Sequence, residues 1–91
     1  MGVYVTIPGT LRRFTGGAGE VEAAGSSVRE LLENLTAQHE GLRERLFADD
    51  AQVRPFINVF VNQENIRHLE GLDTPLADGD RVAIVPAIAG G

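Results

Sequence analysis

The stretch Ser27-Val28-Arg29-Glu30-Leu31-Leu32-Glu33-Asn34-Leu35, residues 27–35, decides the fold of this chain. Its apolar side chains recur at positions i, i+3, i+4 and i+7, which is the spacing of one stripe along an α-helix. Ser27 and Glu30 match a capping box, in which the hydroxyl accepts an early backbone N–H and the carboxylate reaches back. Gly41 is placed to end the helix, and residues 42–47 predict one further helical turn. The sequence therefore predicts a main helix with a single apolar face.

Strands are expected on both sides of this helix. Residues 3–7 and 20–23 alternate apolar and polar side chains, and we expect them to pair as a hairpin with a long loop. Residues 56–61 have the strongest strand pattern, residues 66–69 predict a short return strand, and residues 81–85 predict a final strand that Pro86 ends. Because one helix has one apolar face, it must pack across one face of a single mixed sheet. We therefore predict an α+β fold of the β-grasp type over residues 1–86.

Two glycine-containing segments are predicted to be turns. Residues 15–19 are glycine-rich, but no lysine follows them and no helix opens from them, so a phosphate-binding loop is excluded. Asp78-Gly79-Asp80 is typical of a tight turn that leads into the final strand. We do not expect its two carboxylates to form a catalytic pair.

One face of the predicted sheet remains without a helix. If the helix covers the face that carries Val59, the alternation of strand side chains places Tyr4, Phe56 and Phe60 on the opposite face. A group of apolar side chains there, together with Pro86, would mark a surface that docks a partner. The alternative is that residues 42–50 or a loop partly cover these aromatic side chains.

The chain ends in two glycines that follow Pro86 closely. Residues 87–91 are expected to form a flexible diglycine tail of roughly 15 Å, at about 3.3 Å per extended residue. Glycine has no Cβ, so Gly90 and Gly91 can enter a channel too narrow for other residues. The pattern favours a carrier whose reactive group is its own terminal carboxylate. The alternative is a frayed chain end without a function.

Composition limits the function further. The 91 residues suffice for one small domain, and no segment has the pattern of a membrane span or a signal peptide, so we expect a cytoplasmic protein. The net charge of −5 argues against a nucleic-acid partner and favours a partner with a positive docking surface. The chain has no cysteine, and all eight basic residues are arginine. The absence of lysine limits self-conjugation of an activated terminus, or reflects an arginine-favouring codon composition.

No side chain is predicted to be a catalyst. His39 and His68 are the only histidines, and their surroundings in the sequence do not match a metal-ligand pattern. We also find no combination of serine, histidine and acid that suggests a catalytic triad. We therefore expect a carrier protein that is a co-substrate of partner enzymes, with no metal and no bound cofactor of its own.

The segment from Leu76 to Gly91, LADGDRVAIVPAIAGG, closely resembles the C-terminal signature of prokaryotic ubiquitin-like sulfur carriers. That family includes the small subunit of molybdopterin synthase, the thiamine-thiazole sulfur carrier and a carrier for cysteine biosynthesis. The fragment Leu-x-Asp-Gly-Asp-x-Val, followed by Pro and a terminal Gly-Gly, is specific when it closes a chain of this size. The predicted order of elements extends the resemblance over the whole chain.

The resemblance implies that sulfur is attached at Gly91. An E1-like adenylyltransferase and sulfurtransferase would use ATP to adenylate the carboxylate, and a sulfur donor would then convert it to a thiocarboxylate. A free α-carboxylate, with a pKa near 3.5, is a poor acyl donor, so activation is needed. Ala87, Ile88, Ala89 and Gly90 would insert into the partner. Since this chain has no phosphate-binding loop, the nucleotide would be held by the partner.

Within the family, residues 14–17, 56–62 and 86–91 look most like the carrier for cysteine biosynthesis. The resemblance then implies a pyridoxal-phosphate cysteine synthase that adds the thiocarboxylate to an aminoacrylate, and a metalloprotease that releases cysteine. The alternatives are the small subunit of molybdopterin synthase, with the large subunit as partner, or a carrier for thio-containing secondary metabolites. A protein modifier attached to lysines is a further alternative, and the missing arginine before the diglycine argues against it.

Overall fold

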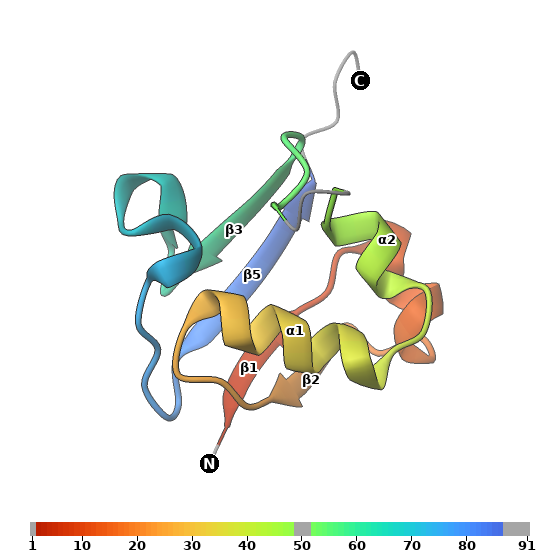
Figure 1. The fold of residues 1–91 in the computed structure, drawn as a ribbon. Helices are drawn as coiled ribbons and strands as arrows, with labels where there is room; N and C mark the ends of the chain where they lie inside the picture. The colour runs from red at the N-terminus through yellow and green to blue at the C-terminus, as the bar shows by residue number, and fades with distance from the viewer. Residues whose placement is uncertain (1, 49–51, 87–91) are drawn as a thin grey trace.

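The structure of the chain is a computed structural model that describes residues 2–48 and 52–86. Five strands form one mixed sheet in the order β2-β1-β5-β3-β4. Helix α1 (Val28–Gln38) crosses one face of this sheet, and the shorter helix α2 (Leu42–Leu46) lies beside it (Figure 1). The predicted α+β fold of the β-grasp type is confirmed.

The N-terminal hairpin forms as the alternating pattern predicts. Strands β1 (Val3–Thr6) and β2 (Glu20–Ala23) pair antiparallel, with Val5 opposite Val21. The long loop contains a 3₁₀ helix, η1 (Gly9–Thr15), which the sequence pattern did not indicate. The chain turns after it at Gly16 and Gly17, whose φ angles are 66° and 89°. The glycine-rich segment is thus the turn that was expected.

Helix α1 begins at a serine cap, but its capping box differs from the predicted one. The Ser27 hydroxyl accepts the backbone N–H of Glu30 at 3.2 Å, as expected. The Glu30 carboxylate accepts the backbone N–H and the hydroxyl of Ser26, at 2.7 and 2.9 Å, so the return bond forms one residue earlier than predicted. These bonds, the backbone one first, lower the pKa of Glu30. The helix ends at Gln38, and Gly41, with φ of 89°, turns the chain into α2.

The second hairpin is shorter than predicted. Strand β3 (Ile57–Val61) pairs antiparallel with the two-residue strand β4 (Glu64–Asn65). Asn62 and Gln63, with φ of 49° and 76°, join them in a tight turn that makes the return strand start at Glu64.

The predicted strand over residues 66–69 is wrong. Ile66–His68 form a 3₁₀ helix, η2, because the side-chain oxygen of Asn65 accepts the N–H of Arg67 at 2.9 Å and starts a helical turn. A second 3₁₀ turn, η3 (Gly71–Asp73), follows before the chain reaches the last strand.

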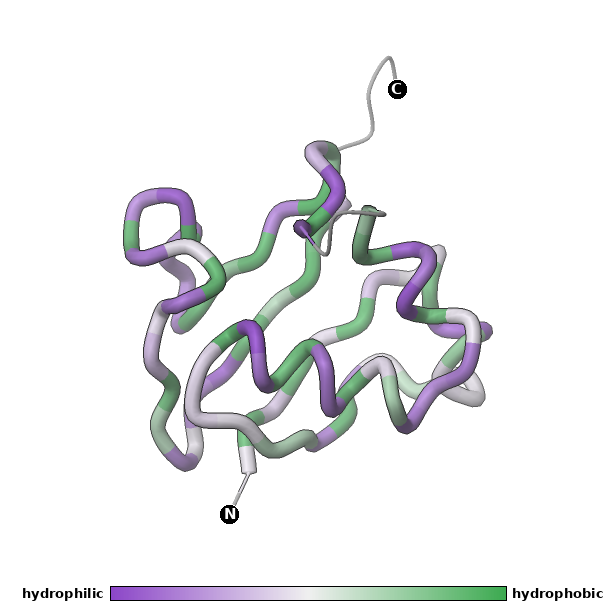
Figure 2. Tube along the Cα trace, viewed as in Figure 1, coloured by the Kyte–Doolittle hydropathy of each residue, from purple (hydrophilic) through white to green (hydrophobic). Residues whose placement is uncertain are grey.

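Strand β5 (Arg81–Pro86) occupies the middle of the sheet, parallel to β1 and antiparallel to β3. Hydrophobic residues lie along β3 and β5, and hydrophobic and polar residues alternate along α1 (Figure 2). Six residues of β1, β3 and β5 beneath the helix are buried: Val3, Val5, Ile57, Val59, Val82 and Ile84. They pack with the α1 stripe and with Leu42 and Leu46 of α2 into one core. The last described residue, Pro86, is thus held by a strand with a neighbour on each side.

Candidate functional site

Strand β5 positions the candidate site because it leads to the C-terminal segment. Pro86 pairs with Ile57 of β3, so the chain leaves the sheet at the end where β3 begins. The residues predicted for tail insertion and sulfur attachment, Ala87, Ile88, Ala89, Gly90 and Gly91, lie outside the described residues. The structure therefore shows the stem from which these residues continue.

The turn at the opposite end of β5 uses its carboxylates for hydrogen bonds within the chain. The Asp78 carboxylate accepts the backbone N–H of Gly2 at 2.6 Å. The Asp80 carboxylate accepts the backbone N–H of Ala77 at 2.8 Å and the side-chain amide of Asn62 at 3.1 Å. These two bonds, the first one foremost, lower the pKa of Asp80. Both carboxylates thus hold a loop in shape, as the turn interpretation predicts.

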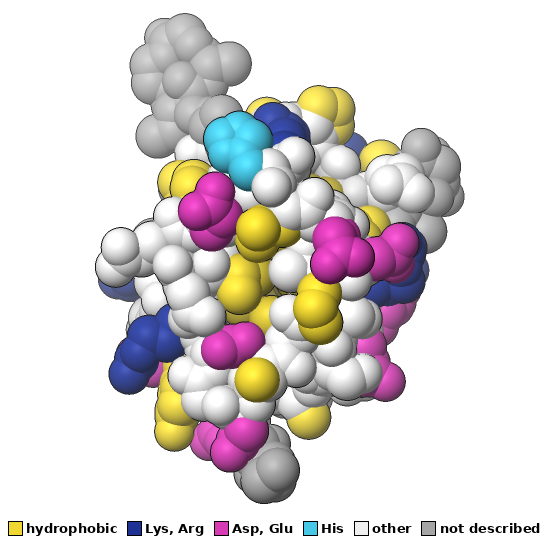
Figure 3. Space-filling view, turned by 90° about the vertical axis from the view of Figure 1, so that its left-hand side faces the viewer, with side chains coloured by type: hydrophobic (Ala, Val, Ile, Leu, Met, Phe, Trp, Pro, Cys, Tyr) yellow, Lys and Arg dark blue, Asp and Glu magenta, His cyan; other side chains and the backbone are white. Residues whose placement is uncertain are grey.

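The acidic and histidine side chains of residues 2–48 and 52–86 contain no group of three that could hold a metal ion. Figure 3 shows one side of the molecule, where Asp and Glu side chains lie spread around exposed apolar ones. His68 lies 3.8 Å from Glu64, and both side chains are largely exposed. In the same described ranges, no helix is long and apolar enough to span a lipid bilayer.

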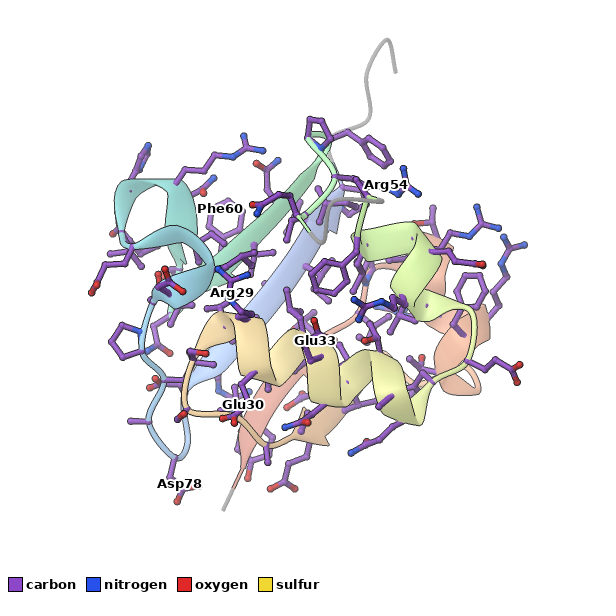
Figure 4. All side chains as sticks on the ribbon, viewed as in Figure 1. Arg29, Glu30, Glu33, Arg54, Phe60 and Asp78 are labelled. Carbon is purple, nitrogen blue, oxygen red and sulfur yellow. The ribbon has the colours of Figure 1, made fainter. Side chains whose placement is uncertain are left out.

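The face of the sheet opposite α1 carries an apolar surface, which we call the open-face patch and define as Tyr4, Phe60, Arg81, Ala83 and Val85. A shallow hollow of about 570 Å³ runs past Phe60, Ala83 and Val85. Arg81 lies over the Tyr4 ring, with 5.2 Å between its guanidinium carbon and the ring centroid, and pairs with Glu20 at 3.3 Å. Tyr4 is 37% exposed and Val85 44%, while Phe60, labelled in Figure 4, is half-buried. Residues 42–48 do not cover this patch, because α2 packs into the core on the α1 side.

Phe56 does not belong to the open-face patch, although the alternation placed it there. Strand β3 begins at Ile57, so Phe56 lies in the preceding turn, where strand periodicity no longer determines its direction. It is 48% exposed and lines a different hollow, beside Pro86. The sequence analysis also missed Val85, although the alternation of Arg81, Ala83 and Val85 with buried Val82 and Ile84 would have predicted it.

The hollow beside Pro86 combines aromatic and basic side chains. We call it the arginine cleft. It has a volume of about 520 Å³, and its walls include Arg13, Arg45, Arg54, Glu44, Phe56 and Pro86. These residues come from η1, from α2, from the segment that leads into β3 and from the end of β5. Figure 4 shows Arg54 at the end of the sheet opposite to Asp78. Two of the four predicted docking residues, Phe56 and Pro86, thus belong to this cleft, and the other two to the open-face patch.

The chain is similar to known proteins over most or all of its length. Residues 5–91 match the ThiS family. The chain is 42% identical over 93 residues to the sulfur carrier protein CysO of Mycobacterium tuberculosis, and the match covers all of both chains. It is 41% identical over 66 residues to small archaeal modifier protein 3 of Haloferax volcanii, covering 72% of this chain and 71% of that protein. Among solved structures, a chain of the Amycolatopsis orientalis BexX/CysO complex superposes with a TM-score of 0.90 at 43% identity, covering 98% of this chain and 99% of that one.

Proposed function

The chain belongs to the ThiS family, and we propose that it is a sulfur carrier protein whose terminal carboxylate, on Gly91, carries the sulfur. The observation that supports this most is the position of β5. Pro86 ends a strand in the middle of the sheet and pairs there with Ile57 of β3, and five small or apolar residues ending in Gly-Gly follow it. The chain has no cysteine, so a carrier role would use the main-chain terminus.

We propose the following chemistry for loading. A carboxylate oxygen of Gly91 attacks the α-phosphorus of ATP held by an E1-like enzyme, and pyrophosphate leaves. Sulfide then attacks the acyl carbon, the bond to AMP breaks, and a thiocarboxylate remains. The adenylate is required because the free carboxylate is a stabilised anion with a poor leaving group. The chain supplies the acyl group and the docking surface, and the partner supplies nucleotide binding and catalysis.

We further propose that the thiocarboxylate serves cysteine biosynthesis. The similarity to the CysO proteins over the whole chain supports this pathway. The thiocarboxylate would add to an aminoacrylate on a pyridoxal-phosphate synthase, and an S-to-N shift, favoured by proximity, would leave cysteine in amide linkage after Gly91. A metalloprotease would then release the amino acid. The similarity to small archaeal modifier protein 3 keeps a protein modifier as the second candidate.

The first test removes Gly91. Deletion should abolish thiocarboxylate formation by the cognate activating enzyme. The melting temperature should stay unchanged, because the buried residues of the described core lie between Val3 and Ile84. Intact-mass spectrometry of the product measures the gain of sulfur. A truncated chain that still acquires sulfur contradicts the proposal.

The product formed from the thiocarboxylate then separates the candidates. Incubation with a pyridoxal-phosphate synthase and an activated serine should add the mass of cysteine to the chain. Return of the free acid only with the large subunit of molybdopterin synthase would contradict the cysteine pathway. Attachment to lysines of other proteins in a lysate from the chain's own cells would instead favour the modifier.

The second test concerns the open-face patch, which we propose as the surface that docks the activating enzyme together with Phe56 and Pro86. Phe60→Glu places a charge among apolar side chains and should weaken binding about tenfold or more, since apolar anchors dominate interfaces. Because Phe60 is only half-buried, the melting temperature should fall little. Leu76→Glu, at a half-buried apolar residue that packs against the core and lines neither the open-face hollow nor the hollow beside Pro86, is the control and should leave binding unchanged. A large loss of stability with normal binding of the folded fraction would show that Phe60 serves the core.

A further inference from the structure

Three arginines converge on the arginine cleft although the chain as a whole is acidic. Arg13, Arg45 and Arg54 line it, and Glu44 is the one acidic residue of its described walls. The chain carries 13 acidic and eight basic residues. A cluster of three arginines is therefore a local reversal of the overall charge.

Contacts with an aromatic ring and a main-chain oxygen hold these arginines in place. The guanidinium carbons of Arg13 and Arg45 lie 5.0 and 5.5 Å from the centroid of the Phe14 ring. The Nε of Arg54 donates to the main-chain oxygen of Glu44 at 2.9 Å. A Cβ on Gly41 would lie 2.9 Å from the Phe14 ring, so only glycine lets the ring sit there. These contacts orient the side chains, and the described residues supply no carboxylate to them.

Three of the five other arginines have carboxylate partners among the described residues, while Arg12 and Arg67 donate to main-chain oxygens. Arg29 pairs with Asp73 at 3.2 Å, Arg81 with Glu20 at 3.3 Å, and Arg43 with Glu33. Within residues 2–48 and 52–86, none of the three cleft arginines lies within ion-pair distance of a carboxylate. The cleft is therefore a preformed site for carboxylate groups from outside these ranges.

We propose that the arginine cleft docks an acidic segment on the surface of the enzyme that receives the C-terminal tail. This inference rests on the proposed carrier function. Pro86 forms part of the cleft wall, so an enzyme that takes up residues 87–91 meets the cleft as it closes on the tail. Guanidinium groups bind carboxylates in a planar, bidentate geometry, which would fix the angle at which the tail enters.

The charge of the remaining surface favours a compact acidic segment of a protein. A net charge of −5 repels an extended polyanion such as a nucleic acid or an anionic membrane. A short segment with two or three carboxylates can contact the cleft alone. The proposal thus places an acidic contact of the partner at the cleft, while net charge favours a positive docking surface elsewhere on that partner.

The test measures ATP–pyrophosphate exchange by the cognate activating enzyme as a function of carrier concentration. Arg45→Glu with Arg54→Glu should raise the KM for the carrier about tenfold with little change in kcat, because the cleft contributes to encounter and docking. Arg29→Glu with Arg67→Glu is the matched control, with the same change in net charge at sites outside the cleft, and should change KM less than about twofold. The rise in KM with ionic strength should be weaker for the cleft variant than for the wild-type chain.

Further measurements keep the outcome decisive. Thermal unfolding checks that each variant folds, and Arg45→Gln with Arg54→Gln repeats the test without added negative charge. Equal KM values for the cleft and control variants contradict the inference. In a binding assay, a chain whose C-terminal carboxylate is converted to the amide, and separately an Asp49→Asn with Asp50→Asn variant, should each retain the affinity difference between wild-type and variant clefts. Loss of that difference would identify the chain's own carboxylate as the occupant and overturn the proposal. Absence of exchange with the wild-type chain contradicts the carrier function instead.

Discussion

The two ends of β5 carry charged side chains that are used in opposite ways. At the N-terminal end, the carboxylates of Asp78 and Asp80 accept main-chain and amide N–H groups of the same chain. At the C-terminal end, the guanidinium groups around Pro86 rest on an aromatic ring and a main-chain oxygen, and the described residues provide no carboxylate for them. Figure 4 marks the two ends by Asp78 and Arg54.

This difference separates charges that stabilise the fold from charges that remain available for a partner. A charged group whose hydrogen bonds are satisfied within the chain gains little from a partner, since it would have to exchange existing bonds. A charged group that is oriented but not neutralised gains from a complementary charge and loses little side-chain entropy on binding. We therefore expect changes at the N-terminal end of β5 to affect stability and changes at the C-terminal end to affect binding.

Of the two changes that we consider at the N-terminal end of β5, Gly79→Ala should lower the stability more than Asp80→Asn. Gly79 has φ of 88°, and its N–H donates to the main-chain oxygen of Gly2 at 2.8 Å, so the turn cannot relax without losing that bond. A residue with a Cβ in this conformation costs roughly 1–2 kcal/mol. The melting temperature should fall by about 5–15 °C. The KM of the folded carrier for its activating enzyme should stay the same.

Gly9→Ala is the matched control for this change. Gly9 has open space around its Cβ position and does not have a positive φ. Its replacement should change the free energy of unfolding by less than about 0.5 kcal/mol. If Gly79→Ala raised KM at unchanged stability, the division between the two ends of β5 would be wrong.

The sequence predicted the parts of the molecule that depend on periodic burial. The stripe from Val28 to Leu35 placed α1 correctly, and the alternation in residues 3–7 and 81–85 placed the core side chains. The predictions failed where a local hydrogen bond replaced periodicity. The cap that Asn65 provides turned the expected strand over residues 66–69 into a 3₁₀ helix, and the turn at residues 55–56 moved Phe56 to another surface.

The site was only partly predictable for a related reason. The C-terminal motif pointed to Gly91 and to Pro86, which are neighbours in sequence. The arginine cleft joins Arg13, Arg45 and Arg54, which are separated by up to 41 residues in the printed numbering. Only the packing of η1 and α2 near the start of β3 brings them together. No periodic pattern in the sequence indicates that these three residues lie together. The net charge of the chain is negative, so it gave no sign of a local excess of positive charge.

Asp80→Asn should give the smallest effect, and its dependence on pH tests the role of the N-terminal end of β5. The pKa of Asp80 is lowered in the folded state from its ordinary value of 3.8, chiefly because the carboxylate accepts the Ala77 N–H. A lowered pKa stabilises the fold fully above the unfolded-state value, and the contribution is lost as the pH falls through the folded-state value. Near pH 7 the variant should lose less than about 1 kcal/mol, since water screens a carboxylate close to the surface.

The difference in melting temperature between wild type and Asp80→Asn should therefore shrink as the pH falls below 3.8. Glu40→Gln is the control, because Glu40 is exposed and has no hydrogen bond or ion pair among the described residues. It should show no such difference at any pH. A difference for Asp80→Asn that persisted at low pH would mean that the change disturbs packing, because a protonated carboxyl and an amide are equally uncharged there. The carboxylate would then stabilise the turn through its shape and not through its charge.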